Sequence, residues 1–140
     1  DREKIQAVIK SMKEKGIGRV LGTLTDRWFT DEFIENSPAD VERRLEQVME
    51  TDEEVFLEVF RIYSETEMSP WLDEIMHPCL VLTGEKDGGC NPRLNHLIAD
   101  RLPNSELCIL KHYKHSLLVE APEKVGEKIY KFLVEQFGLT

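Results

Sequence analysis

The sequence predicts an α/β protein in which a helical half is followed by a βαβα half. Two observations support this fold class. Through most of residues 1–76, apolar residues recur every three or four positions, which is the spacing of helices that bury one face. From residue 77 onward, short apolar runs alternate with helical patterns, as in parallel strands joined by a crossing helix. We therefore expect a helical region over residues 1–76 and a βαβα region over residues 77–140.

Start and stop signals divide the helical half. Apolar spacing over residues 5–12 predicts a first helix, which ends at Gly16 after nearby lysines. Residues 21–29 are apolar and aromatic, and their pattern leaves their form open. The Ser-Pro pair at 37–38 predicts a further helix, with the serine as its cap. Residues 51–54 read as a capping box that starts another.

The second half is recognised from apolar runs and turn signals. A Ser-Pro pair at 69–70 predicts one short helical turn before the second half begins. Strands are expected over residues 79–84 and 106–110, and helices over residues 92–102 and 122–137. Because one helix joins the two strands, they should be parallel with a right-handed crossover.

A sheet of two parallel strands is marginal on its own. Parallel sheets normally have both faces covered and further strands beside them. The run at 79–82 is apolar enough to expect such burial. We therefore expect the remaining strands to come from a preceding segment or from another chain.

The composition argues against nucleic-acid and membrane partners and favours a cytoplasmic protein. The formal net charge is −9 and basic residues are spread along the chain, which argues against a nucleic-acid partner. The apolar runs are too short for a membrane span or a secretory signal, so no membrane partner is expected. The three cysteines, Cys79, Cys90 and Cys108, form no paired framework, and we expect them to be reduced in a cytoplasmic protein.

An acid and a histidine follow the two predicted strands. Asp87 comes soon after the strand at 79–84, and His115 comes soon after the strand at 106–110. The carboxyl ends of parallel strands lie at one edge of a sheet, where open α/β sheets place their reactive groups. Asp87 and His115 should therefore face one another.

Several sequence features occur in combination. They are Arg-Trp-Phe-Thr at 27–30, the apolar strand and its acid at 78–87, Pro92, Leu-Pro-Asn-Ser at 102–105, and His115 followed by Glu-Ala-Pro-Glu at 120–123. In this combination the chain resembles the α/β-hydrolases, and among them the 3-oxoadipate enol-lactonase type and related small esterases. The resemblance implies a helical cap over residues 1–76 and the C-terminal βαβα part of an α/β-hydrolase over residues 77–140, with a parallel sheet that is incomplete in this chain.

The resemblance also implies a Ser-His-Asp mechanism on a small carboxylic ester or lactone, with no cofactor and no metal. Asp87 would orient His115, which would act as general base toward a serine hydroxyl. No serine of the chain lies in the Gly-x-Ser-x-Gly elbow that presents such a nucleophile, so we expect the isolated chain to be inactive. Lys114 stands before the histidine where the family commonly has glycine.

The aromatic pair Trp28 and Phe29 has two open interpretations. In the resembled family the cap overhangs the active site, so both side chains could line the substrate pocket. Both could equally pack the cap against the core.

Other interpretations of the chain stay open beside this one. The chain could be a non-catalytic hydrolase-like interaction module, or a truncated fragment that forms a homo-oligomer through its exposed sheet edge. Within the same fold, cofactor-free haloperoxidase chemistry or carbon–carbon bond hydrolysis stays open. His112 and His115 with Cys90 or Cys79 fit no compact metal-ligand spacing. Packing is favoured over reactivity for the Cys90 thiol.

Overall fold

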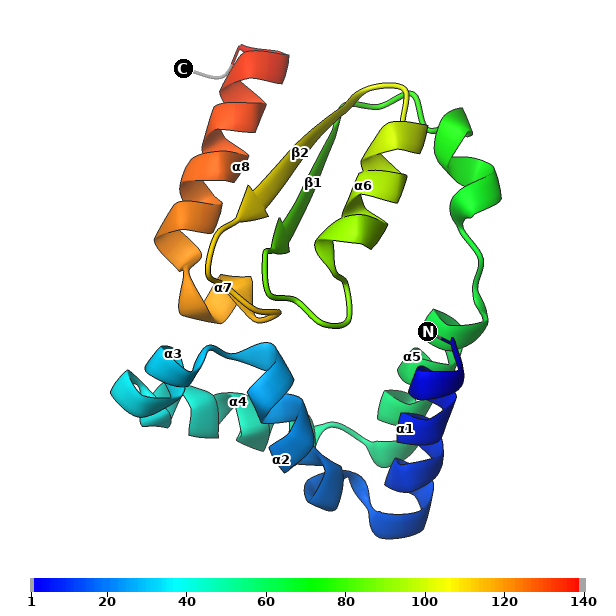
Figure 1. Cartoon of the computed structure of the whole chain (residues 1–140), viewed down its shortest axis with the longest axis vertical. Helices are drawn as coiled ribbons and strands as arrows, with labels where there is room; N and C mark the ends of the chain where they lie inside the picture. Colours follow the sequence, from blue (N-terminus) through cyan, green and yellow to red (C-terminus); the bar gives the residue numbers. More distant parts are fainter. Residues whose placement is uncertain (1, 139–140) are drawn as a thin grey trace. The chain divides into compact units, whose positions relative to one another are not determined.

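A computed structural model describes residues 2–138 of the chain (Figure 1). The chain divides into two compact units. The first, here called the helical unit, comprises the chain up to residue 26 together with residues 31–67. The second, here called the sheet unit, comprises residues 27–30 and the chain from residue 68 onward. Among the described residues, no helix combines the length and the apolar character needed to cross a membrane.

The helical unit is built from five α-helices, the second of which ends in the sheet unit. In order they are α1 (Arg2–Lys15), α2 (Ile17–Trp28), α3 (Asp31–Asn36), α4 (Pro38–Glu50) and α5 (Glu53–Glu65). Helices α1 and α5 lie against each other, as do α3 and α4. The stop predicted at Gly16 is observed, with a left-handed φ of 80°. The segment at 21–29, whose form was left open, forms most of α2. The apolar face of this helix is buried at Ile17, Val20, Leu21 and Leu24.

The two predicted helix caps need correction. Ser37 occupies the N-cap position of α4, but its side chain makes no capping hydrogen bond. The predicted start at 51–54 is shifted by one residue, because Asp52 is the N-cap of α5 and its carboxylate accepts from the Val55 amide at 3.1 Å. Thr51 instead ends α4, and its hydroxyl donates to the Gln47 carbonyl at 2.9 Å.

The sheet unit contains a two-stranded parallel sheet and its connecting helices. In order its elements are the 3-10 helix η1 (Ser69–Glu74), β1 (Cys79–Gly84), α6 (Pro92–Arg101), β2 (Ser105–Leu110), α7 (Leu117–Glu120) and α8 (Pro122–Phe137). The pairing of β1 with β2 runs in register from Cys79 opposite Ser105 to Gly84 opposite Leu110. The predicted strands and long helices are therefore observed to within a residue, whereas α7 was not predicted.

Helices cover the two faces of this sheet. Because successive side chains of a strand point to opposite faces, β1 and β2 contribute to two apolar clusters. One cluster is formed by Leu72, Val81 and Leu102, with Cys79 and Leu107 packed against it. The other is formed by Leu110, Leu117 and Val125, with Leu82 and Cys108 packed against it. Figure 1 shows α6 and α8 on either side of the strands. This burial on both faces accounts for the apolar strand sequences.

The division between the units differs from the domain boundary expected between residues 76 and 77. Helix η1 belongs to the sheet unit because Leu72 packs with Val81 of β1, and because the Arg101 guanidinium donates to the Ser69 carbonyl at 3.0 Å. Residues 27–30 also belong to the sheet unit, through hydrogen bonds described below. Packing therefore places the boundary between residues 67 and 68, and residues 27–30 belong to the sheet unit although they lie within the helical half of the sequence.

Candidate active site

Asp87 lies in a tight turn just beyond β1 and is almost fully buried, with 5% of its surface exposed. The turn is closed by a hydrogen bond from the Asp87 amide to the Gly84 carbonyl at 3.1 Å. Carboxylate oxygen Oδ1 accepts from the amides of Gly89 at 2.8 Å and Cys90 at 2.9 Å. These two bonds fix the plane of the carboxylate and leave Oδ2 to face the loop that follows β2.

His115 binds that second oxygen. The distance from His115 Nδ1 to Asp87 Oδ2 is 2.7 Å, and 45% of the histidine side chain is exposed. An ionised carboxylate only accepts hydrogen bonds, so the proton belongs on Nδ1 in this arrangement. The structure therefore brings together the two residues that the sequence placed at one sheet edge. Their catalytic roles stay predictions.

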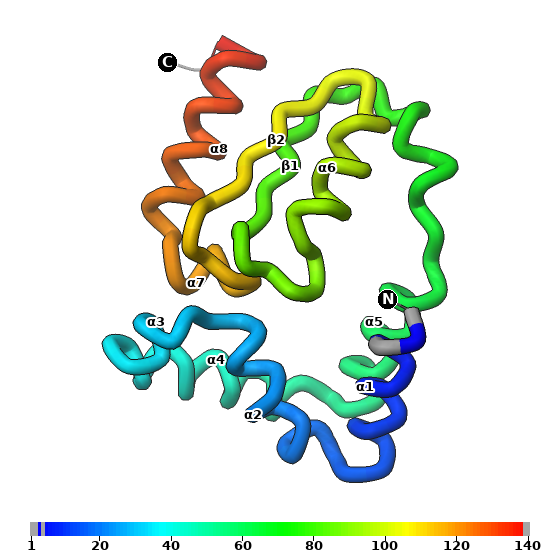
Figure 2. The backbone as a smooth tube through the Cα atoms, in the orientation of Figure 1, coloured from blue at the N-terminus to red at the C-terminus, as the bar shows by residue number. Residues whose placement is uncertain are grey.

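The loops that carry Asp87 and His115 are bound to each other by backbone hydrogen bonds. The Glu85 amide donates to the Leu110 carbonyl, and the Lys86 amide donates to the Tyr113 carbonyl, both at 2.9 Å. In Figure 2 both loops leave the same edge of the sheet. Gly84 allows this approach, because a Cβ there would overlap the Lys114 carbonyl oxygen and lie 2.5 Å from the Tyr113 oxygen. The acid and the histidine are thus held on one jointly constrained pair of loops.

His112 adds a strained residue to the second loop. Its φ is 73°, in the left-handed region that residues with a side chain rarely adopt. Its amide donates to the Glu85 carboxylate at 3.0 Å, which helps hold this conformation. His112 therefore helps set the backbone path of the loop, and it is not part of the acid–histidine pair.

A short segment from the end of α2 is tied to the other side of His115. The amide of Ser116, the next residue after the histidine, donates to the Trp28 carbonyl at 2.8 Å. The Thr30 amide donates to Glu120 Oε2 at 3.2 Å, and the Thr30 hydroxyl donates to Oε1 of the same carboxylate. We call residues 27–30 the strap. The sequence reasoning missed these contacts, although Thr30 and Glu120 both lie in the motifs that carried the family resemblance.

The aromatic residues of the strap differ in exposure. Phe29 is fully buried, so its side chain packs within the protein and is not presented to solvent. Trp28 is partly buried. A substrate-lining role for Trp28 and Phe29 stays a prediction.

Opposing influences set the pKa of the Asp87 carboxyl. Burial alone raises this pKa, because a charge is less favourable away from water. The hydrogen bond and the charge of His115 lower it, and the amides of Gly89 and Cys90 lower it further. The net result is a pKa below the ordinary value. Asp87 is therefore suited to remain ionised beside the imidazole.

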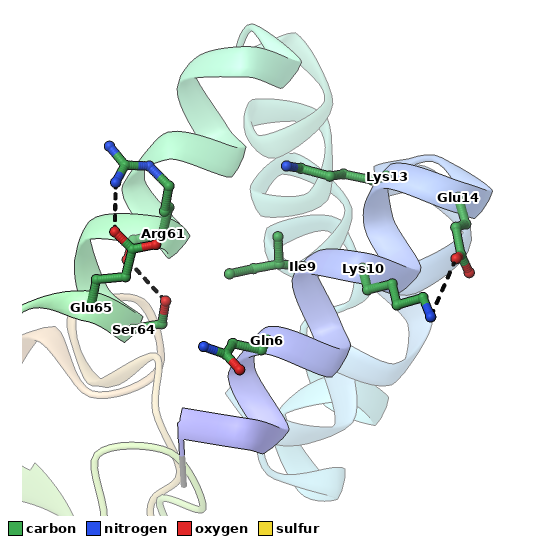
Figure 3. A pocket seen from close by; sticks show the side chains of 8 residues that line it. All are labelled: Gln6, Ile9, Lys10, Lys13, Glu14, Arg61, Ser64 and Glu65. Carbon is green, nitrogen blue, oxygen red and sulfur yellow. Dashed lines mark hydrogen bonds and ion pairs between the residues drawn. The ribbon is translucent and has the colours of Figure 1, made fainter.

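A separate surface pocket lies in the helical unit, between α1 and α5 (Figure 3). Its walls are mostly long polar side chains, several of which form ion pairs with each other, as Lys10 does with Glu14 and Arg61 with Glu65. None of its lining residues belongs to the acid–histidine pair. The carboxyl whose pKa is lowered and its histidine partner lie instead at the sheet edge, which stays the predicted place of the reactive chemistry.

Comparison with known proteins agrees with this fold. No protein-family model matches the chain. The chain is 28% identical over 124 residues to 3-oxoadipate enol-lactonase 2 of Acinetobacter baylyi, a match that covers 89% of this chain and 46% of the relative.

Solved structures match the same architecture. The enol-lactonase from Burkholderia xenovorans LB400 superposes with a TM-score of 0.89 at 19% identity, covering 94% of this chain and 50% of that one. A thermophilic esterase from Thermogutta terrifontis gives a TM-score of 0.82 at 21% identity, covering 96% and 50%. The chain spans about half the length of the relatives it matches. The fold class predicted from the sequence is thereby confirmed, and the chain has the architecture of part of an α/β-hydrolase.

Proposed function

We propose that this chain supplies the acid and the histidine of a serine hydrolase that cleaves a small carboxylic ester or lactone. The observation that carries the proposal is the 2.7 Å contact between His115 Nδ1 and the buried Asp87 carboxylate. The ester or lactone class is taken from the enol-lactonases and the esterase that the chain resembles.

The geometry suits proton transfer at the other ring nitrogen of His115. With Nδ1 bound to Asp87, the Nε2 lone pair would accept the proton of a serine hydroxyl as the oxygen attacks the carbonyl carbon. The imidazolium would then protonate the leaving alcohol, and the histidine would later activate water against the acyl-enzyme. Such general-base assistance contributes typically about 10²–10⁴-fold. Asp87 stabilises the imidazolium through the same hydrogen bond.

The nucleophile would come from a partner segment. We infer that an N-terminal half, in the same polypeptide or in a companion chain, supplies the serine on a strand-to-helix elbow. Two features support this inference. The sheet has two strands among residues 2–138, which leaves strand edges for pairing. Helix α8 also exposes large apolar side chains, including Tyr130 and Phe137.

Esterase turnover tests the proposal. The chain joined to the segment that precedes it in its gene, or to a companion chain, should hydrolyse p-nitrophenyl acetate. His115→Ala should lower this turnover by roughly 10⁶-fold. His96→Ala, on the exposed side of α6, is the matched control and should have no effect. Unchanged turnover in His115→Ala, or a gene that encodes no such elbow in either place, would sink the proposal. The isolated chain should show no turnover above background.

A non-catalytic role is the second candidate. The open strand edges and the exposed apolar side chains of α8 would also suit association with another copy of this chain. Sedimentation equilibrium of the isolated chain would then report a dimer, whereas a monomer at all concentrations would count against this role. A cytoplasmic location stays a prediction; it agrees with three cysteines that form no disulfide.

A further inference from the structure

A thiol lies beside the acid–histidine pair. One ligand atom each from Asp87, Cys90 and His115 lies within 4.8 Å of the others. A serine-dependent mechanism has no use for this thiol. Sulfur, imidazole nitrogen and carboxylate oxygen are together the donor types that Zn²⁺ takes in proteins.

The backbone of Cys90 is fixed on both sides of its side chain. Its amide donates to Asp87 Oδ1 at 2.9 Å. Its carbonyl accepts from the Thr83 hydroxyl and from the Asn95 side-chain amide, each at 2.7 Å. Asn95 is buried, so this contact is shielded from water. The backbone that carries the thiol is therefore held next to Asp87.

We infer that Asp87, Cys90 and His115 form a binding site for a thiophilic divalent cation such as Zn²⁺, which breaks the acid–histidine hydrogen bond when it binds. The inference concerns ion binding and does not rest on the proposed hydrolase function. If that function holds, the bound cation would inhibit it. The group differs from the set of two histidines and a cysteine considered in the sequence, because it contains His115 and not His112.

The required movements are small. Metal–ligand bonds of about 2.0–2.3 Å in a tetrahedron place neighbouring ligand atoms roughly 3.3–3.6 Å apart. His115 Nδ1 and Asp87 Oδ2, now 2.7 Å apart, would have to separate slightly. The thiol would have to close from at most 4.8 Å. Because two amides hold the Asp87 carboxylate, rotation of the His115 and Cys90 side chains would have to supply both changes, and the exposure of His115 would let water provide a fourth ligand.

Protons balance without any redox change. The Cys90 thiol releases one proton to solvent and binds as thiolate. His115 keeps one proton, which moves from Nδ1 to Nε2, so that Nδ1 can donate its lone pair to the metal. Asp87 binds through Oδ2, while Oδ1 keeps its two amide bonds as an outer support. The ion therefore occupies Nδ1, the nitrogen that Asp87 orients, and the displaced proton sits on Nε2, the nitrogen that would act as base.

Cobalt spectroscopy of the isolated chain tests the site without any activity assay. Co²⁺ added to chelator-treated protein should bind at one ion per chain and give a thiolate-to-cobalt charge-transfer band in the near ultraviolet. Zn²⁺ should displace it and abolish the band. Cys90→Ser should eliminate the band, and His115→Ala should weaken Co²⁺ binding at least about tenfold. Cys108→Ser, which alters another partly buried cysteine that forms no disulfide, is the matched control and should keep the band.

Three results would overturn the inference. They are a band that survives in Cys90→Ser, a band lost equally in Cys108→Ser, and wild-type Co²⁺ affinity in His115→Ala. Circular dichroism establishes that each variant is folded. If Cys90→Ser does not fold, the wild-type chain still decides the question by NMR. Zn²⁺ should then remove the His115 Nδ1 proton resonance, and persistence of that resonance at about 1 mM Zn²⁺ would refute the site.

Discussion

Gly84 is the position where a single methyl group should separate the acid loop from the histidine loop. A Cβ at Gly84 would overlap the Lys114 carbonyl oxygen and lie 2.5 Å from the Tyr113 oxygen and 2.8 Å from the Tyr113 carbonyl carbon. All three atoms are backbone atoms, so no side chain can rotate away. Restoring even the shortest separation that real Cβ atoms show, 3.0 Å, requires the Tyr113 oxygen to move by 3.0 − 2.5 = 0.5 Å. The Lys114 oxygen, next to His115, must move further.

This displacement sets the expected magnitude. Forcing extra atoms into a packed region costs typically about 1–3 kcal/mol. A loss of 1–2 kcal/mol lowers the folded-to-unfolded ratio about 5- to 30-fold. Gly84→Ala should therefore lower the free energy of unfolding by about 1–3 kcal/mol. In an assembled enzyme it should also reduce turnover by about 10²-fold, as expected for a shift of the histidine by up to 1 Å.

Urea unfolding followed by circular dichroism is the direct assay. Gly88→Ala is the matched control, because a Cβ at Gly88 meets nothing within 4 Å and its φ lies outside the left-handed range. The control should change stability by less than about 0.5 kcal/mol, or raise it slightly by restricting the unfolded chain. If Gly84→Ala and Gly88→Ala unfold at the same urea concentration, the close approach of the two loops does not constrain the protein, and the reasoning fails.

Three further predictions address the surrounding contacts. The lowered pKa of Asp87 means that its stabilisation is present above its unfolded-chain value, about 3.9, and is lost as pH falls through the folded value. In chelator-containing buffer, lowering the pH should therefore reduce the free energy of unfolding less in Asp87→Asn than in wild type. Equal reductions in the two proteins would contradict this. Thr30→Val and Glu120→Ala should each cost about 1 kcal/mol and combine non-additively in urea unfolding, because both remove the hydrogen bond from the Thr30 hydroxyl to the Glu120 carboxylate; simple additivity counts against the strap. His112→Gly should have a free energy of unfolding roughly 1 kcal/mol above that of His112→Ala, since glycine adopts the positive φ of this position more easily. The reverse order would refute strain at residue 112.

The sheet unit could be predicted from sequence because several local signals agreed. Pro92 opens α6 and Pro122 opens α8, and between them the apolar run of β2 is too short for a helix. Once one helix joins two strands, chain topology determines which edge receives the residues that follow them. The contact between Asp87 and His115 followed from that topology, although they are 28 positions apart.

Other features were hidden for physical reasons. Helix α2 carries buried residues at helical spacing, but Gly18 and Gly22 lower its intrinsic helix propensity and obscured its form. The bond between Thr30 and Glu120 joins residues 90 positions apart, and neither belongs to a periodic pattern. Such polar contacts depend on how the chain returns to the sheet, which local sequence rules do not encode.

The acid–histidine pair is organised from within the sheet unit. Asp87 Oδ1 is held by two amides of its own turn, and Oδ2 by His115. Lys86 binds the second loop before the histidine, and Ser116 binds the strap after it. A preorganised base needs little further ordering when it meets a nucleophile, so a partner segment would have only to bring a hydroxyl within hydrogen-bond reach of Nε2. The same preorganisation makes the pair a ready ligand for a thiophilic cation, because the adjacent Cys90 is fixed by the turn that fixes the acid.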